Sequence, residues 1–207
     1  MEALAIDAPV AAPRGRPREF CTEAALAQAL RVFWTRGYEG ASLTELTEAM
    51  GVTRPSLYAA FGNKEQLFRK ALDLYEREKL AFMQTALEAP TARGVAERLL
   101  TAAVEMQSCA HSPKGCLEVT ATTACGAEAQ GVRDEVVARR AAALGPLQAR
   151  FRRAAAEGDF PADIEPEGLV RFLMAVMTGL AVQAGSGAGC AELRSLMDTT
   201  LKLWPGR

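Results

Sequence analysis

Apolar residues recur every three or four positions along most of this chain, which is the spacing of one face of an α-helix. The first such segment covers residues 24–35, with Leu26, Leu30 and Phe33 on one face, and Gly37 follows it. No stretch alternates apolar and polar residues as a half-buried strand would. The pattern therefore predicts an all-α protein of about nine helices.

Residues 42–61 contain the residues that begin and end two short helices. Ser42 is a candidate N-cap with Glu45 three residues later, the spacing of a capping box. Gly51 stands where the end of a helix needs a left-handed residue. Pro55 is tolerated in the first turn of the second helix because an N–H there has no intrahelical partner.

The second short helix can be only about two turns long. Phe61 and Gly62 close it, and Asn63 with Gln66 forms the next capping box. Leu57 and Phe61, four residues apart, are expected to face inward. The opposite face is small and mostly polar, which suits an approach to base edges and phosphates. It consists of Arg54, Pro55, Ser56, Tyr58 and Ala59.

A set of short motifs across this segment matches one known family. The motifs are Gly37-Tyr38, Ser42-Leu43-Thr44, Gly51-Val52-Thr53, Ser56-Leu57-Tyr58, Phe61, Lys64-Glu65 and Leu67. Together they resemble the N-terminal DNA-binding domain of the TetR (tetracycline-repressor) family, without a gap over roughly residues 20–75. The resemblance implies a three-helix DNA-binding unit with a helix-turn-helix, in a protein that regulates transcription, usually by repression.

The resemblance also implies roles for individual residues. One group of residues would contact bases and a second group would contact phosphates. The N-terminus of its own helix would help Lys64, in the second group, to bind a phosphate. The base-contacting group is Arg54, Pro55 and Ser56, and the phosphate-contacting group is Thr44, Tyr58 and Lys64.

Charge is unevenly distributed, although the formal net charge is only −1. Residues 13–64 carry a net charge of +2 and the rest of the chain −3, so attraction to phosphate is expected from a local stripe. Arg14, Arg16 and Arg18 lie in an RGRPR tract, which is either an arm along the DNA or a solvated tether. Residues 1–13 are acidic and contain two prolines, which predicts a disordered leader rather than a secretory signal.

Further helices are expected after this unit. The chain is expected to divide into a DNA-binding domain at 14–62 and an effector-binding and dimerisation domain at 63–207. The expected helices run from Asn63 to the mid-eighties, over about 95–110, about 117–124, about 132–158 with a kink near Gly145-Pro146, over 166–185, and near the C-terminus.

The predicted helix over 166–185 is apolar on two sides. One side can cover the core, and the other, with Val170, Met174, Ala175 and Gly179, can pair with a second subunit. The alternative is that both sides belong to the core of one chain. The resemblance implies a homodimer built by this helix and the last one, which would place two recognition helices on a palindromic double-stranded DNA operator. The expected interface residues are Val170, Met174, Met177, Leu193, Leu196, Met197, Leu201 and Trp204.

Family members enclose a small-molecule effector between their middle helices. The candidate lining here is apolar with small polar groups and little charge, which favours an uncharged, aromatic or lipophilic effector. For any single one of these residues, ordinary packing is the more common explanation. The candidates are Phe82, Met106, Cys109, Cys116, Thr120, Thr123, Phe151, Phe172 and Met177.

Cys116 follows Lys114 and Gly115 at a predicted helix N-terminus, where the helix dipole and a nearby ammonium group would lower the pKa of the thiol. Some members that resemble this chain around KGCL sense electrophiles or oxidants through such a cysteine. An inert buried thiol is the interpretation that we favour, and a sensing thiol is the alternative. Cys109, His111 and Cys116 are weak metal-site candidates beside a paired CxxC motif, so we expect no metal and no cofactor.

Composition and motifs argue against other classes of protein. We expect no membrane span, because no apolar run near 18 residues is evident. Five cysteines without an export signal favour reduced thiols in the cytoplasm. A Cys/His enzyme is the rival class, but the single histidine, His111, has no evident third catalytic partner, and no phosphate loop is present. We therefore do not expect an enzyme.

Overall fold

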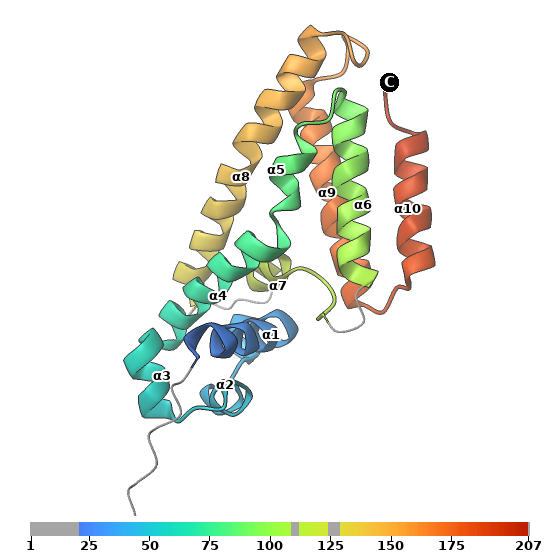
Figure 1. The fold of residues 1–207 in the computed structure, drawn as a ribbon. Helices are drawn as coiled ribbons and strands as arrows, with labels where there is room; N and C mark the ends of the chain where they lie inside the picture. Colours follow the sequence, from blue (N-terminus) through green and yellow to red (C-terminus); the bar gives the residue numbers. More distant parts are fainter. Residues whose placement is uncertain (1–20, 109–111, 124–128, 207) are drawn as a thin grey trace, which may run out of the picture.

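The structure, a computed structural model, describes residues 21–108, 112–123 and 129–206. The described part is helical without a strand, which confirms the expected all-α class (Figure 1). The leader at 1–13 and the RGRPR tract lie outside the described residues. The helices are α1 (Thr22–Gly40), α2 (Leu43–Met50), α3 (Arg54–Phe61), α4 (Lys64–Lys79), α5 (Phe82–Ala86), α6 (Ala92–Ser108), α7 (Leu117–Thr123), α8 (Gln130–Ala156), α9 (Pro166–Gly185) and α10 (Cys190–Lys202).

The caps of α2 lie where the sequence predicts them. The Ser42 side chain accepts a hydrogen bond from the backbone N–H of Glu45 at 3.1 Å, and Gly51 ends the helix with a φ of 66°. Only glycine adopts that left-handed conformation without a steric cost. The Glu45 side chain pairs with Arg36 of α1, 3.1 Å away, so the interaction ties α2 to α1 rather than completing a capping box.

The helices on either side of Gly62 are capped in the same way. The Thr53 side chain accepts a hydrogen bond from the backbone N–H of Ser56 at 3.4 Å. At α4, Asn63 Oδ1 accepts from the backbone N–H of Gln66 at 2.8 Å, while Gln66 Oε1 accepts from that of Asn63 at 3.0 Å. The predicted capping box at Asn63 is confirmed, and it satisfies two backbone N–H groups at the start of α4.

A first hydrophobic core joins α1, α2, α3 and α4 to α7 and the start of α8. In it, the Phe33 and Phe68 rings meet edge to face at 5.1 Å, and the Trp34 and Tyr75 rings at 4.8 Å. α4 therefore contributes its buried face to the same core as the helix-turn-helix. In Figure 1 it leads from α1–α3, at one end of the molecule, to the remaining helices.

The long helix expected after Asn63 is interrupted. α4 ends at Lys79, and α5 begins at Phe82 after a break at Leu80, whose φ of −106° and ψ of 3° are not helical. The break lets α5 pack against α6. α8, by contrast, continues as one helix past Pro146.

A second core joins α5, α6, the C-terminal half of α8, α9 and α10. Phe151 is fully buried in it and meets the Trp204 ring edge to face at 6.2 Å. α6, α9 and α10 pack against one another and run side by side in Figure 1. Two of these helices, α6 and α9, also line a cavity between the two cores.

By length and composition alone, α9 is long and apolar enough to cross a membrane, with a mean hydropathy of 1.5 over 18 residues. The expectation that no such run exists is therefore wrong for Pro166–Gly185. One such helix is weak evidence for a membrane protein, because core helices of soluble proteins have the same composition. Only 33% of this window is buried within the chain, so much of its apolar surface has no cover in a single subunit.

Candidate nucleic-acid interface and internal cavity

α3 has a buried inner face and an exposed outer face, as predicted. Leu57 and Phe61 retain only 0% and 5% of their accessible surface, whereas Tyr58 retains 47%. The outer face can therefore meet a partner without any rearrangement of the core. Its exposed residues are Arg54, Pro55, Ser56, Tyr58 and Ala59.

Hydrogen bonds organise the polar groups at the N-terminus of α3. Arg54 Nη2 donates to Thr44 Oγ1 at 2.8 Å, and both residues are exposed. The hydroxyl oxygens of Thr53 and Ser56 lie 2.9 Å apart. The start of α2 and the start of α3 therefore share one polar surface, which holds the Arg54 guanidinium in place.

Lys64, the first residue of α4, is half-buried beside this surface. Its Nζ lies 4.7 Å from the centre of the Tyr38 ring and 3.5 Å from the carbonyl oxygen of Glu39, to which it donates a hydrogen bond. Partial burial lowers the pKa of Lys64, and the nearby Glu39 charge acts in the opposite direction. An anion near Nζ would relieve that cost of burial. Arg14, Arg16 and Arg18 lie outside the described residues.

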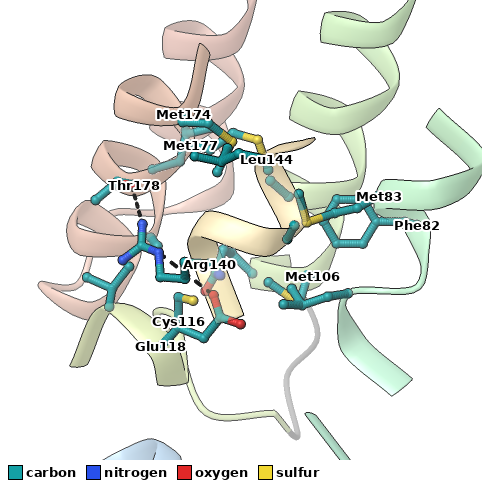
Figure 2. Close-up of a pocket in the computed structure, with 17 residues that line it drawn as sticks. Phe82, Met83, Met106, Cys116, Glu118, Arg140, Leu144, Met174, Met177 and Thr178 are labelled. Atoms are coloured by element: carbon teal, nitrogen blue, oxygen red, sulfur yellow. Dashed lines mark hydrogen bonds and ion pairs between the residues drawn. The ribbon is translucent and has the colours of Figure 1, made fainter. Parts of the chain in front are cut away.

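A cavity of about 140 Å³ lies among the middle helices, between the two cores (Figure 2). Four of the residues expected to line it do so: Phe82, Met106, Cys116 and Met177. Much of the remaining wall is apolar and comes from Leu80, Met83, Ala103, Val119, Ala143, Leu144, Met174, Leu180 and Ala181.

Several other candidates for the lining lie elsewhere. Thr120 packs against Gly37 of the first core, and Phe151 is enclosed in the second core. Phe172 is 45% exposed and its ring centre lies 6.3 Å from that of Trp204. Cys109 and the side chain of Thr123 lie outside what the structure describes. The sequence placed Thr120, Phe151 and Phe172 on the correct helices, but periodicity could not show which side of each helix meets the cavity.

Charged and polar groups at one end of the cavity were not predicted. Figure 2 shows Glu118 of α7 and Arg140 of α8 near each other, with Met174, Met177 and Leu144 toward the other end. Arg140 Nε lies 3.9 Å from Glu118 Oε2. The expectation of little charge in the lining is therefore wrong. The sequence feature that could have indicated this charge is Glu118, the single carboxylate in the otherwise uncharged helix α7, LEVTATT.

Burial raises the pKa of Glu118 to about 7, against an effect of Arg140 in the opposite direction and with a further rise from Glu76. A carboxyl group whose folded pKa is raised binds more protons when folded than when unfolded, so stability falls as the pH rises toward 7. We expect Glu118→Gln to remove this loss. The free energy of unfolding of Glu118→Gln relative to wild type should therefore increase by about 2 kcal/mol from about pH 5 to about pH 8.

Urea unfolding at both pH values measures this gain. Glu157→Gln, at an exposed carboxylate after α8, is the matched control and should show no such difference between the two pH values. A Glu118→Gln effect that is the same at both would contradict the assignment of the raised pKa.

Cys116 differs electrostatically from the expectation. Burial raises the pKa of its thiol, although Tyr75 Oη donates a hydrogen bond to Sγ at 3.3 Å. Lys114 Nζ donates instead to the backbone carbonyl of Gln107. The alternative of a lowered thiol pKa is therefore contradicted, because desolvation outweighs the effects at the helix N-terminus. Among the described residues, no group of three or more His, Cys, Asp or Glu could hold a metal ion, and Cys109 and His111 lie outside them.

A short hydrogen-bonded path connects the cavity wall to the first core. Trp34 Nε1 donates a hydrogen bond to the carbonyl oxygen of Gly115 at 3.2 Å. The side chain of Gln107 makes two hydrogen bonds to the same residue: Oε1 accepts from its N–H at 2.8 Å, and Nε2 donates to its carbonyl oxygen at 3.0 Å. Gly115 has a φ of 86°, which favours glycine. Gln107 and Cys116 both line the cavity. A ligand there would therefore contact the residue that is hydrogen-bonded to Gly115 and the residue that follows Gly115 in the chain.

The residues expected at a subunit interface are largely covered by their own chain. Val170, Leu193 and Trp204 are buried in the second core at 1%, 1% and 6% exposure, and Met174 and Met177 line the cavity. The others, Leu196, Met197 and Leu201, are partly buried against the second core.

α9 nevertheless has an apolar or small-residue stripe on its outer side. Phe172 and Val182 are 45% and 50% exposed, Gly168 and Ala175 are also exposed, and Gly179 is partly so. The spacing of 168, 172, 175, 179 and 182 alternates between four and three, which keeps these positions on one face of a helix. We call these five residues the α9 stripe.

The exposed polar face of α3, its capped position after α2 and the helical domain behind it define a DNA-binding transcriptional regulator. Residues 25–71 match the profile described as "Bacterial regulatory proteins, tetR family", and residues 95–186 match "Tetracyclin repressor-like, C-terminal domain". The chain is 32% identical over 194 residues to the HTH-type transcriptional repressor ComR of Escherichia coli (strain K12), covering 93% of this chain and 92% of ComR. It belongs to the TetR family.

Solved structures agree with this assignment. A cysteine mutant of the TetR family transcriptional regulator CifR, complexed with 26-bp double-strand operator DNA, is similar with a TM-score of 0.85 and 42% sequence identity. The match covers 92% of this chain and 100% of that one. A TetR transcriptional regulator from Chloroflexus aurantiacus J-10-FL, at 19% identity and a TM-score of 0.71 over 89% of this chain and 95% of that one, shares the fold.

Proposed function

We propose that this protein is a homodimeric repressor that places α3 of each subunit in the major groove of a palindromic operator and is released by a small molecule in the internal cavity. The observation that carries the proposal is the exposed polar face of α3, held over the buried Leu57 and Phe61. The relative ComR is named a repressor, and CifR was solved on operator DNA, which supports the same role here.

Within this proposal, the residues of the α3 surface divide into two roles. Side chains at the N-terminus of a recognition helix reach base edges, whereas groups at the margins reach phosphates. The RGRPR arm, with Arg14, Arg16 and Arg18, would follow the DNA backbone or enter the minor groove. We assign base contacts to Arg54, Pro55 and Ser56, and phosphate contacts to Thr44, Tyr58 and Lys64.

We infer that the second subunit packs on the α9 stripe. Its central positions, Ala175 and Gly179, are small and would let two copies of α9 approach closely, with Phe172 and Val182 on either side. A twofold axis there pairs each stripe with itself. The apolar composition of α9, of which only 33% is buried within one chain, supports this placement. We also propose that the DNA-binding domain covers residues 14–62 and that the effector-binding and dimerisation domain covers residues 63–207. α4, the first helix of the second domain, packs against α1 and α3 of the first.

The proposed switch couples the cavity to the spacing between the two α3 helices. A ligand against Cys116 and Gln107 would favour one position of Gly115 and, through its hydrogen bond, of Trp34 in α1. A ligand shifts such an equilibrium only by its difference in affinity for the two states. The proposal includes no catalytic step, and since the protein acts on DNA we place it in the cytoplasm.

Selection of binding sites from random double-stranded DNA tests the proposed function. We expect a palindrome whose half-sites lie about 10 base pairs apart, centre to centre, because two recognition helices must enter successive major grooves. Recovery of a single asymmetric half-site would contradict the dimeric arrangement, and the absence of any enriched sequence would contradict specific DNA binding.

Lys64→Ala is expected to weaken binding to all duplexes by a similar factor. Removal of one phosphate contact should lower the slope of log affinity against log salt by about one unit for each subunit. Titrations of the operator and of a scrambled duplex at several salt concentrations measure both effects. Lys202→Ala, at an exposed lysine at the end of α10, is the control. An unchanged slope in Lys64→Ala would refute the phosphate contact.

A further inference from the structure

Carboxylates outnumber guanidinium groups where α4, α7 and α8 meet. The ion pairs of this region involve five carboxylates and three guanidinium groups. The carboxylates are Glu65, Asp73, Glu76, Glu118 and Glu135, and the guanidinium groups belong to Arg69, Arg139 and Arg140. Two of these carboxylates, Glu76 and Glu118, and two of the guanidinium groups, those of Arg139 and Arg140, line the main cavity or a second hollow beside it.

Neither arginine near Glu118 neutralises it well. Arg139 is held by Asp73 at 2.5 Å, Glu135 at 2.8 Å and Glu76 at 3.1 Å. Arg140 approaches Glu118 only to 3.9 Å, the longest ion pair among the described residues, and its Nη2 donates to Thr178 Oγ1 at 3.4 Å. Glu118 is nevertheless well enclosed, since its side chain is only 13% exposed.

Glu76 has an unused acceptor close to the same place. Its Oε2 accepts from Arg139, but its Oε1 is buried and has no hydrogen-bond partner among the described residues. Glu76 and Glu118 both line a second hollow. This hollow shares four lining residues with the main cavity: Leu80, Met83, Glu118 and Ala143. A buried acceptor without a partner is costly, so both carboxylates favour a ligand that donates hydrogen bonds or carries positive charge.

We propose that the effector is a small amphiphilic cation, with an ammonium or amidinium group between Glu76 and Glu118 and an apolar body in the main cavity. This rests on the proposed function, since it names the ligand of the same site. The volume of the main cavity, about 140 Å³, is close to that of a cavity of about 150 Å³ that holds benzene, so it has room for one aromatic ring. One aromatic ring with a short aminoalkyl chain fits these limits.

The opposite assignment, an anion bound by Arg140, is less favourable. Arg140 already interacts with Glu118 and Thr178. An anion would enter next to Glu76 and Glu118, and like charges repel. Arg139 and Arg140, which line the same hollows, already have carboxylate partners. A cation instead supplies a partner to Glu118 and to the unused Oε1 of Glu76 while leaving Arg140 in place.

The same placement gives a route from ligand to DNA. Glu76 belongs to α4, and its bond to Arg139 is one of the ion pairs that tie α4 to α8. A cation that attracts Glu76 competes with Arg139 for it. Occupancy would therefore loosen the attachment of α4, the helix that follows the recognition helix.

The test compares three probes with the same ring: 2-phenylethylamine, 2-phenylethanol and phenylacetate. Isothermal titration at neutral pH should show the amine binding at least about 10-fold more tightly than the alcohol, and the anion more weakly than both. Glu118→Gln and Glu76→Gln should each abolish most of the amine's advantage while leaving alcohol binding within about 3-fold. Glu157→Gln should keep the advantage.

Operator binding without any probe is measured on the same samples. Wild-type protein that binds its operator but prefers phenylacetate, or shows no preference for the amine, overturns the cationic effector and leaves the DNA-binding role intact. An amine preference that survives in Glu118→Gln and Glu76→Gln also overturns it. Failure of the wild type to bind any operator would instead contradict the proposed function.

Discussion

Gly179→Arg is expected to convert the protein to a monomer and to lower operator affinity by at least about 100-fold. Gly179 lies at the centre of the exposed α9 stripe, and a Cβ added there meets nothing within 4 Å in the single chain. The substitution should therefore leave the folded subunit unchanged. Across a twofold axis, two arginines would face each other in an apolar contact, where unpaired charge is costly.

The matched control is Gly145→Arg, on the exposed side of α8. Gly145 is also helical, and an added Cβ there also meets nothing within 4 Å. The two variants introduce the same side chain and the same charge. Sedimentation should give a mass near 22.1 kDa for Gly179→Arg and twice that for the control. A dimeric Gly179→Arg with normal operator affinity would show that the α9 stripe is not the subunit interface.

Arg54→Ala is expected to weaken operator binding by about 100-fold or more, because each half-site loses about 1–3 kcal/mol and the dimer contains two of them. Arg54 is exposed at the first position of α3, and its hydrogen bond to Thr44 holds it on the proposed DNA surface. The loss should be larger for the operator than for a scrambled duplex, because a base contact is lost only on the correct sequence.

Arg152→Ala is the control for this substitution. Arg152 is exposed near the C-terminal end of α8 and pairs with Glu167 in the first turn of α9. In Figure 1 the part of α8 that meets the start of α9 lies at the opposite end of the molecule from α3, so the variant removes the same charge without changing the proposed surface. Fluorescence anisotropy of the two variants on both duplexes separates the effects. Equal losses on the operator and the scrambled duplex would make Arg54 a phosphate contact rather than a base contact.

The DNA-binding end of the fold could be predicted in detail because its determinants are local. The cap at Ser42, the glycine turn at Gly51 and the capping box at Asn63 each depend on residues within three or four positions. Such short-range hydrogen bonds fix where α2, α3 and α4 begin or end. With those ends fixed, the helical period decides that Leu57 faces inward and Arg54 outward.

The cavity and the subunit interface depend instead on contacts between distant parts of the chain. Glu118 and Arg140 meet only because α7 packs on α8, and no spacing in the sequence records that contact. In α9, periodicity correctly indicated two apolar faces, but not which of them the other helices would cover. Val170, which was expected at the subunit interface, lies in the core. Phe172, which was expected in the cavity, lies on the α9 stripe.

The most direct test of the central claim is a titration of the wild-type protein with fluorescent duplexes of the selected operator, its isolated half-site and a scrambled sequence. We expect the operator to bind about 1,000-fold more tightly than the scrambled duplex at physiological salt, with two subunits per duplex. The half-site should bind far more weakly than the operator. Equal binding of all three duplexes would contradict a dimeric, sequence-specific regulator that contacts DNA through α3.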